Sequence, residues 1–190
     1  MRELALHILD IAENSLAANA DQINITIEED LLGDILNIYI QDNGRGMDPD
    51  IVARITDPFI TSRQTRKVGL SIPFFKAAAE ACDGTFNITS EPGQGTTVAA
   101  TFKHSHIDRM PLGNMAGTIL SLIIGTPEVH WIYQHQVNQN TFEFDTQPVK
   151  EILNGVPLSE PAVMKYIRET LEEGIHNVRC NHDTELMYSK

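Results

Sequence analysis

Two neighbouring segments of this 190-residue chain alternate strictly between apolar and polar residues, and this pattern limits the folds open to it. Isoleucine or leucine occupies every second position of both segments (Ile23, Ile25, Ile27; Leu36, Ile38, Ile40). Alternation with a period of two is typical of strands that bury one face. The Gly33-Asp34 pair between the segments favours a turn. The sequence therefore predicts a half-buried hairpin.

The segment before the hairpin predicts a helix that faces the core. Over residues 2–18 the apolar side chains recur at a period of about 3.6 and form one broad stripe (Leu4, Ala5, Ile8, Leu9, Ile11, Ala12, Leu16). The narrow stripe on the other side is polar (Glu3, His7, Asp10, Asn14). This polar stripe is a candidate for a solvated face or for a binding site.

The later segments predict further helices and strands and one domain boundary. After the first hairpin we expect a short helix at 49–55 and an aperiodic loop at 57–68. An alanine-rich helix at 69–83 and a second hairpin, 86–89 with 97–102, should follow. Periodicity is lost over 103–114, so we divide the chain into domains at 1–105 and 106–190. The second part predicts a small α+β unit (helix 115–124, strands 129–137 and 142–144, helix 161–173).

Charge and cysteine content disfavour several classes of function. The 26 acidic residues outnumber the 14 basic ones, and the net charge of -12 argues against non-specific binding to nucleic acid or to anionic membranes. Cys82 and Cys180 lie far apart in no zinc-binding spacing, which fits a reduced, cytoplasmic protein. We see no apolar run near the roughly 20 residues that span a bilayer.

Asp10 and Asn14 form the first candidate site, because residues one helical turn apart are neighbours. A carboxylate beside an amide oxygen can bind a hard divalent cation such as Mg²⁺ and can also hold a water molecule. The alternative is an ordinary solvated face, since such pairs are common on surface helices.

The DNGRGM loop at residues 42–47 forms the second candidate site. Asp42, at the end of a strand, can accept a hydrogen bond from an exocyclic amine such as that of adenine. Gly44 and Gly46 let the backbone lie against a flat ring, because they carry no Cβ. An ordinary turn is the alternative, as Asp, Asn and Gly are the usual turn residues.

The third candidate site lies where Gly69 opens a helix just after Arg63, Arg66 and Lys67. The free amides at the amino terminus of a helix, together with nearby cations, can bind phosphate. The basic residues could equally be solvated. The histidines form no recognised metal motif, so we expect no metal other than Mg²⁺.

The order of these segments resembles that of the GHKL ATPases, the family that includes histidine kinases, MutL and gyrase. The N box is matched by ILDIAENSLAANADQINITI, in which an acidic residue stands four positions before the Asn of ENS. The adenine box is matched by DNGRGM, the kinase F box by DPFITSR, the GLGL segment by VGLSI and the last hairpin by GTFNITSEPGQGTTVAATF. This resemblance covers about residues 4–103. It implies an α+β fold, the GHKL α/β sandwich, with a mixed, mainly antiparallel sheet covered by helices.

The resemblance also implies roles for individual residues in binding Mg-ATP. Asn14 would be the Mg²⁺ ligand and Asp42 the adenine anchor. Asp10 occupies the position of the water-activating Glu of MutL-type enzymes, which makes it the candidate catalytic residue. The adenine pocket and its edge would be shaped by Gly44, Gly46, Met47 and Thr96. The phosphates would be met by Arg63, Lys67, Gly69, Leu70 and Ser71.

Three departures from the family pattern limit these implications. Asp10 is one methylene shorter than Glu, which puts a general-base role in doubt, because proton abstraction requires hydrogen-bond reach. Lys67 and Ser71 replace glycines of the usual GxGLGL pattern, which implies a stiffer lid. Few residues precede the N box, so we expect no phosphoacceptor hairpin and no complete histidine kinase.

The whole chain also resembles small stand-alone bacterial ATP-binding proteins that are labelled histidine-kinase-like. These are often linked to iron-only hydrogenase gene clusters, an association that supplies no mechanism. For residues 106–190 we expect a surface that binds a protein partner or a second copy of the chain, as in a homodimer.

Two hypotheses of different classes account for these features. In the first, the chain is a Mg-ATP-binding regulatory protein that hydrolyses ATP or transfers a phosphoryl group to a partner protein, and is therefore an ATPase or a protein kinase. In the second, it is a non-catalytic module that senses ATP or ADP and controls a partner. A MutL-like clamp is a third hypothesis, which the acidic charge and the short chain disfavour.

Overall fold

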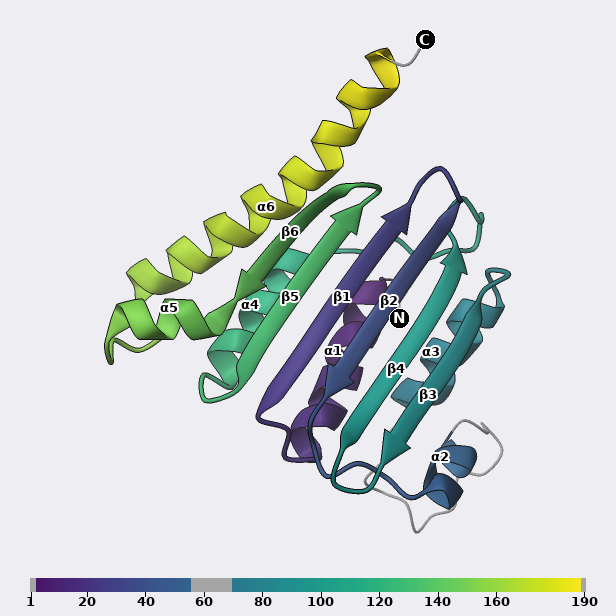
Figure 1. The fold of residues 1–190 in the computed structure, drawn as a ribbon, viewed down its shortest axis with the longest axis horizontal. Coiled ribbons are helices and arrows are strands. Elements are labelled where there is room, and N and C mark those ends of the chain that lie inside the picture. The colour runs from purple at the N-terminus through teal and green to yellow at the C-terminus, as the bar shows by residue number, and fades with distance from the viewer. Residues whose placement is uncertain (1–2, 56–69, 189–190) are drawn as a thin grey trace.

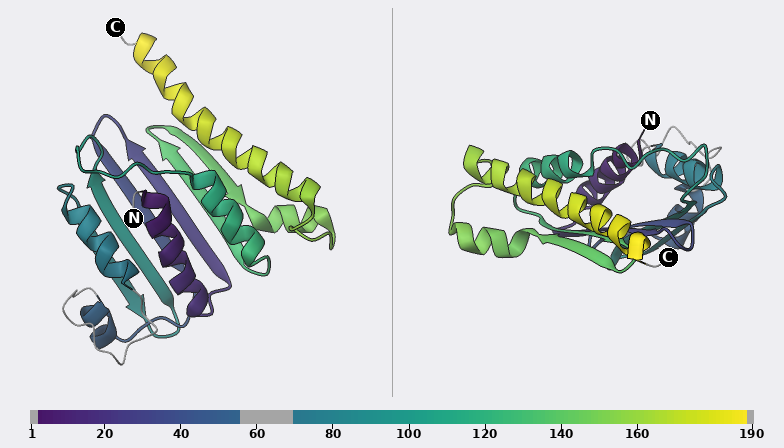
Figure 2. Two further views of the ribbon diagram at one scale, coloured as in Figure 1. Left: turned by 180° about the vertical axis from the view of Figure 1, so that it is seen from behind. Right: turned by 90° about the horizontal axis from the view of Figure 1, so that it is seen from above.

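A sheet with helices on one face organises the structure (Figure 1). The computed structural model describes residues 3–55 and 70–188, with side chains as far as residue 180. In this part of the chain six strands pair in the order β3-β4-β2-β1-β5-β6, and the β1–β5 pairing is parallel while the others are antiparallel. Seen from behind, α1, α3, α4 and α6 lie on the same face (Figure 2). The predicted class, α+β with a mixed and mainly antiparallel sheet, is confirmed.

The alternating segments form the two predicted hairpins. β1 (Gln22–Asp30) pairs with β2 (Ile35–Asp42), and β3 (Thr85–Glu91) pairs with β4 (Gly95–Lys103). Every second side chain of β1 is buried, which places its isoleucines on the covered face. β2 also pairs with β4, where Asp42 lies opposite Thr96. This register brings the end of the first hairpin to the turn of the second.

Two helices, α1 (Leu4–Ala17) and α3 (Ser71–Glu80), cover these strands and contact each other. The predicted apolar stripe of α1 faces the core. The polar stripe, however, is not solvated along its whole length, because His7 is only 3% exposed. Its ring stacks on that of Phe75 in α3, with 5.5 Å between the centroids. Of the two adjacent phenylalanines in α3, Phe75 is buried and Phe74 is half exposed.

The predicted short helix after the first hairpin is confirmed as α2 (Pro49–Ile55). The predicted loop at 57–68, with Arg63 and Lys67, lies outside the described residues, as does Gly69. The alanine-rich helix begins at Ser71 in the described part of the chain.

The segment after residue 106 extends the same sheet. α4 (Met115–Gly125) leads to β5 (His130–Val137) and β6 (Asn140–Asp145), which confirms the predicted helix and two strands. The sequence analysis did not predict α5 (Thr146–Leu153). The last helix, α6 (Pro161–Tyr188), continues well past the predicted end at residue 173. In the part of the chain that the structure describes, we find no helix both long and apolar enough to cross a membrane.

The β1–β5 pairing joins the two parts of the chain that the sequence analysis divides at residue 105. One buried cluster contains side chains from both parts, among them Ile25 of β1 and Trp131 of β5. The two parts therefore share a sheet and a core, and their division into separate domains stays a prediction.

A buried carboxylate, Glu29, connects four segments at one end of the sheet. It continues the buried phase of β1 and is only 7% exposed. His135 of β5 and His104 contact its two oxygens at 2.8 and 3.0 Å, and Arg179 of α6 donates to one of them at 3.0 Å. Burial alone would raise the pKa of Glu29, but the hydrogen bonds from His135 and His104 and the charge of Arg179 outweigh it and lower the pKa to about 2.

We predict that Glu29→Gln lowers the free energy of unfolding by about 2 kcal/mol at neutral pH, because it removes the charge that these donors share. Since folding lowers the pKa, the contribution of the carboxylate is present above its ordinary pKa of 4.5 and is lost as the pH falls through about 2. Urea unfolding at about pH 7 and about pH 3 checks this prediction. The difference between wild type and variant should shrink at the lower pH, and an unchanged difference would contradict the assignment.

Candidate functional site

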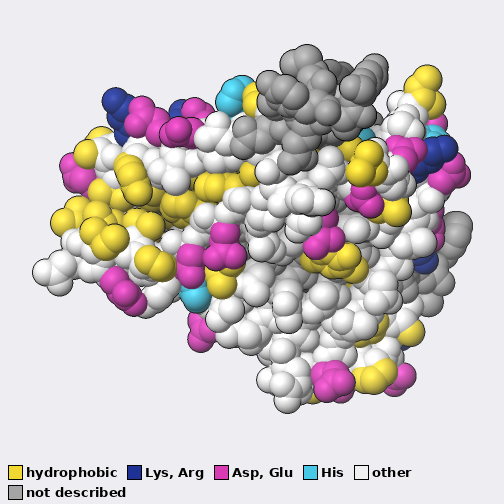
Figure 3. Space-filling model, turned by 45° about the horizontal axis from the view of Figure 1, so that its top comes forward, with side chains coloured by type: hydrophobic (Ala, Val, Ile, Leu, Met, Phe, Trp, Pro, Cys, Tyr) yellow, Lys and Arg dark blue, Asp and Glu magenta, His cyan; other side chains and the backbone are white. Residues whose placement is uncertain are grey.

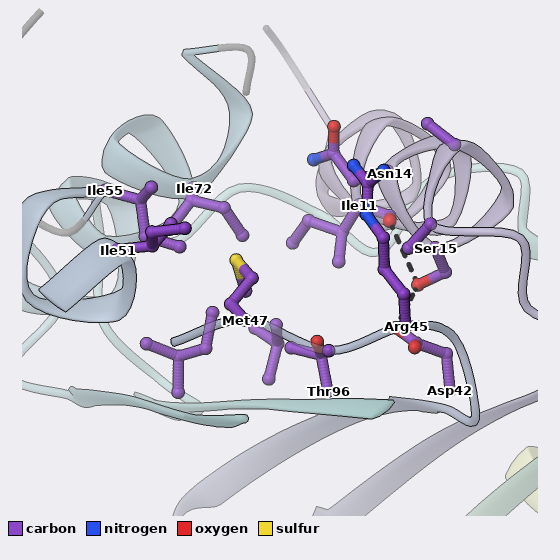
Figure 4. A pocket seen from close by; sticks show the side chains of 15 residues that line it. Ile11, Asn14, Ser15, Asp42, Arg45, Met47, Ile51, Ile55, Ile72 and Thr96 are labelled. Carbon is purple, nitrogen blue, oxygen red and sulfur yellow. Dashed lines mark hydrogen bonds between the residues drawn. The ribbon is translucent and has the colours of Figure 1, made fainter. Parts of the chain in front are cut away.

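A cavity of about 220 Å³ lies between α1, α2, the first turn of α3 and strands β3 and β4 (Figure 4). Its walls are mainly apolar (Ile11, Met47, Ile51, Ile55, Ile72, Ile88, Val98). Among the described residues, its polar lining comes from few side chains (Asn14, Ser15, Asp42, Arg45, Thr96). Apolar walls with a few placed polar groups are the usual composition of a small-molecule site.

Asp42 is the buried acceptor of this cavity, with an exposure of only 8%. The hydroxyl of Ser15 donates to its Oδ2 at 2.6 Å, and the amide of Gly44 donates to its Oδ1 at 2.9 Å. Each carboxylate oxygen has two lone pairs, so these two bonds hold the group in place and leave it able to accept a hydrogen bond from a ligand. Asp42 thus lies at the end of β2 and lines the cavity, and its role as the adenine anchor stays a prediction.

The loop after Asp42 is held by its backbone against α1 and the second hairpin. The amide of Arg45 donates to the Ala18 carbonyl at 2.9 Å, and the amide of Gly93 donates to the Arg45 carbonyl at 2.7 Å. A Cβ at Gly46, where φ is +65°, would overlap the carbonyl oxygen of Glu91. Gly46 lines the cavity, and because it has no side chain it also lets the loop pack closely on β3.

Thr96 lines the cavity and lies opposite Asp42 in the β2–β4 register. Its hydroxyl lies 2.9 Å from that of Ser90, which also accepts from the amide of Met47 at 2.9 Å. The side-chain hydrogen bond to Asp42 comes instead from Ser15. The sequence analysis did not single out Ser15, although it directly follows Asn14.

Asn14 and Ser71 join the two helices at the rim of the cavity. The side-chain amide of Asn14 donates to the hydroxyl of Ser71 at 2.7 Å. Within the described residues, the side-chain carbonyl oxygen of Asn14 has no hydrogen bond, so it remains available as a ligand for a hard cation. Ser71 opens α3, where first-turn amides lack partners within the helix, and the exposed Leu70 precedes it.

Of the other predicted site residues, Gly44, Leu70 and Asp10 are described by the structure and do not line the cavity. Asp10 lies one turn before Asn14 on α1 and is half-buried. Arg63, Lys67 and Gly69 lie outside the described residues. Arg45, which the sequence analysis also did not single out, extends from the loop toward Asn14 (Figure 4).

Histidines and carboxylates elsewhere do not form a metal centre in the part of the chain that the structure describes, where no three such residues or cysteines converge. His104 contacts Glu29, whereas His106 lies 3.8 Å from Asp83. The HSH sequence thus supplies two separate contacts to carboxylates.

The family of histidine kinase-, DNA gyrase B- and HSP90-like ATPases matches residues 1–106. The Non-motile and phage-resistance protein of Caulobacter vibrioides is 27% identical over 111 residues, which cover 54% of this chain and 13% of that protein. Sensor protein kinase FleS of Pseudomonas aeruginosa is 35% identical over 89 residues, which cover 47% of this chain and 22% of that protein. The matched segment is therefore less than a quarter of either relative.

Two solved structures are similar in fold. The MutL ATPase domain of Aquifex aeolicus complexed with ADP superposes with a TM-score of 0.53 at 14% identity, covering 81% of this chain and 70% of that one. The N-terminal domain of a DNA repair protein superposes with a TM-score of 0.56 at 14% identity, covering 92% of this chain and 57% of that one. At these identities the likeness concerns the fold alone.

Replacing Gly46 tests how the loop is held. We predict that Gly46→Ala lowers the free energy of unfolding by about 2 kcal/mol or more, because the new Cβ meets the Glu91 backbone and also strains a positive φ. Gly93→Ala is a matched control, since φ is +76° there but no atom lies near the position of the Cβ. It should cost only the strain of about 1 kcal/mol. Urea unfolding measures both values, and equal losses would show that the close approach at Gly46 is unimportant.

Proposed function

The chain belongs to the family of histidine kinase-, DNA gyrase B- and HSP90-like ATPases, and we propose that its cavity binds the adenine of ATP through Asp42. The domain is thus an ATP-binding domain of the histidine kinase type.

The arrangement of Asp42 carries the proposal. Its carboxylate faces an otherwise apolar cavity and is held by Ser15 and the Gly44 amide. An oriented acceptor matches the exocyclic amine of adenine, whereas guanine presents a carbonyl oxygen at the corresponding edge. At about 220 Å³ the cavity is smaller than the roughly 300–1,000 Å³ of pockets that enclose whole ligands. It suits the base, and the ribose and phosphates would lie outside it.

The polar groups at the rim suit the phosphates. Ser71 and Ile72 present the first amides of α3, and Arg45 adds a cation on the Asn14 side. Helix amino-terminal amides with a nearby cation favour bound anions. The carbonyl oxygen of Asn14, which has no hydrogen bond to the residues that the structure describes, suits Mg²⁺. When bound, this cation would neutralise phosphate charge and keep several waters of its own. Gly69, Arg63 and Lys67 remain proposed phosphate contacts on the strength of the sequence.

Turnover of ATP, with hydrolysis or phosphoryl transfer to a protein partner, is the regulatory function that we propose. Asp10 would orient the attacking hydroxyl from its place one turn before Asn14. The alternative, a sensor of ATP or ADP without turnover, rests on the side chain of Asp10, which is one methylene shorter than the Glu of MutL-type enzymes and so has less reach as a base. In both cases the response to the nucleotide would pass to a protein partner. We further propose that this partner belongs to an iron-only hydrogenase system and that the chain is cytoplasmic.

We predict that Asp42→Asn weakens ATP binding by about ten- to hundredfold, because the amide removes an acceptor and turns a donor toward the adenine amine. Calorimetric titration of ATP, ADP and GTP, with and without Mg²⁺, measures the change. Asp48→Asn is the matched control, since this carboxylate lies just beyond the same loop and outside the cavity lining, and the variant should bind ATP as wild type does. Unchanged ATP affinity in Asp42→Asn would refute the adenine assignment.

Asp10 distinguishes the enzyme from the sensor. We predict that Asp10→Asn keeps its ATP affinity while turnover falls by about 10² to 10⁴, the usual contribution of a positioned base. Asn14→Ala should instead lose the Mg²⁺-dependent part of the affinity. Steady-state phosphate release and calorimetry separate the two effects. If wild type shows no turnover above background, with or without candidate partner proteins, and Asp10→Asn binds ATP as wild type does, the sensor is the correct assignment.

A further inference from the structure

The helix α5 is amphipathic, and its own chain covers its apolar side only in part, because Val149 and Leu153 pack against the core while Ile152 stays exposed. Asp145 caps it by accepting from the Gln147 amide at 2.7 Å, and Asn154 ends it in the left-handed conformation. Val149, Ile152 and Leu153 recur on one side, but Thr146 is the only buried residue of this helix. A helix of this length is marginal by propensity alone, so its apolar side calls for packing.

The apolar side of α5 faces the first turns of α6 across a groove of about 290 Å³. Ala162, Val163 and Tyr166 form the α6 wall. Ile152 is 83% exposed and Tyr166 is 58% exposed. Figure 3 shows hydrophobic side chains gathered at the end of the molecule where Figure 1 places α5 and the start of α6. An apolar patch of this kind on a charged protein marks an interaction surface.

The charges around this groove favour a second copy of the chain over a strongly charged partner. Residues 146–170 carry as many cations (Lys150, Lys165, Arg168) as anions (Glu151, Glu160, Glu169), whereas the whole chain has a net charge of -12. The groove region is therefore close to neutral on an acidic molecule. Two copies of the chain repel each other elsewhere but can approach here, whereas a strongly basic or acidic partner gains no local attraction.

We propose that the α5–α6 groove is the interface between two copies of this chain. A two-fold axis through the groove would bury Ile152 and Tyr166 of both copies, with the first turns of the two α6 helices antiparallel. Lys165 and Glu169 lie one turn apart on the exposed edge of α6, with 3.7 Å between Nζ of Lys165 and Oε1 of Glu169. Antiparallel packing makes this edge self-complementary. Lys165 would then contact Glu169 of the partner subunit, and Glu169 would contact Lys165 of the partner subunit. The proposal goes beyond the nucleotide site and does not depend on it.

Sedimentation equilibrium of the full chain tests the interface. Protein concentrations of up to about 100 µM lie well above a micromolar Kd for dimerisation. Wild type should have the mass of two chains, and Ile152→Lys should raise the dissociation constant by at least about tenfold, because it buries a charge. Leu32→Lys is the matched control, because Leu32 is equally exposed, at 83%, in the turn after β1. It should leave the dimer intact. A monomeric wild type would overturn the proposal and assign the groove to a different protein, and a dimer that survives Ile152→Lys would place the interface elsewhere.

The charged edge gives a second test that does not rely on an apolar substitution. Lys165→Glu makes the edge wholly acidic and Glu169→Lys makes it wholly basic, so each variant alone should dimerise more weakly than wild type. An equal mixture of the two should form heterodimers, because every contact then pairs opposite charges. Raised salt should weaken these heterodimers, as both residues are exposed. A mixture that stays as monomeric as its components would contradict the antiparallel arrangement.

Discussion

The sheet buries only one of its two faces, and this constraint determines where both candidate sites lie. β1 and β5 alternate strictly between buried and half-buried side chains, so the helices that pack on the sheet share one layer. α1 occupies the middle of this layer, with contacts to α3 on one side and α4 on the other. Between α1 and α3, at the end where β2 finishes, the layer leaves room for the cavity. The groove lies at the far end, beside α6.

The cavity owes its shape to close contacts between backbones. The loop after Asp42 approaches β3 at Gly46, and the second hairpin approaches the end of β2 at Gly95, where a Cβ would overlap the carbonyl oxygen of Asp42. These contacts fix the Asp42 backbone, while Ser15 and the Gly44 amide fix its side chain. Because the Asp42 carboxylate is already held in one orientation, it loses little further conformational entropy when a base binds, and this favours binding of the base.

The sequence was sufficient to predict the elements with strong periodicity and the residues with a chemical signature. The hairpins follow from the alternating isoleucines, and Asp42 follows from its place between a strand and two glycines. Ser15 was missed because one hydroxyl in a helix carries no signal without its partner, which is 27 positions away. Glu29 could have been found, because it continues the buried phase of Ile23, Ile25 and Ile27. α5 was missed because a helix of 8 residues is too short to show a clear period.

The helix layer offers a contiguous route between the cavity and the carboxyl-terminal segment. Asn14 and Ser15, near the end of α1, contact Ser71 and Asp42, while α1 contacts α4 and α4 contacts α6. Along the sheet, in contrast, β1 pairs on both sides and Glu29 ties its end to His135 and Arg179. This network resists movement of the strands. A nucleotide can shift the position of α6 by this route only if α1 has two arrangements and the nucleotide binds one of them more tightly than the other. The Asn14–Ser71 hydrogen bond joins α1 to α3 at the rim, so any shift of α1 relative to α3 would change it.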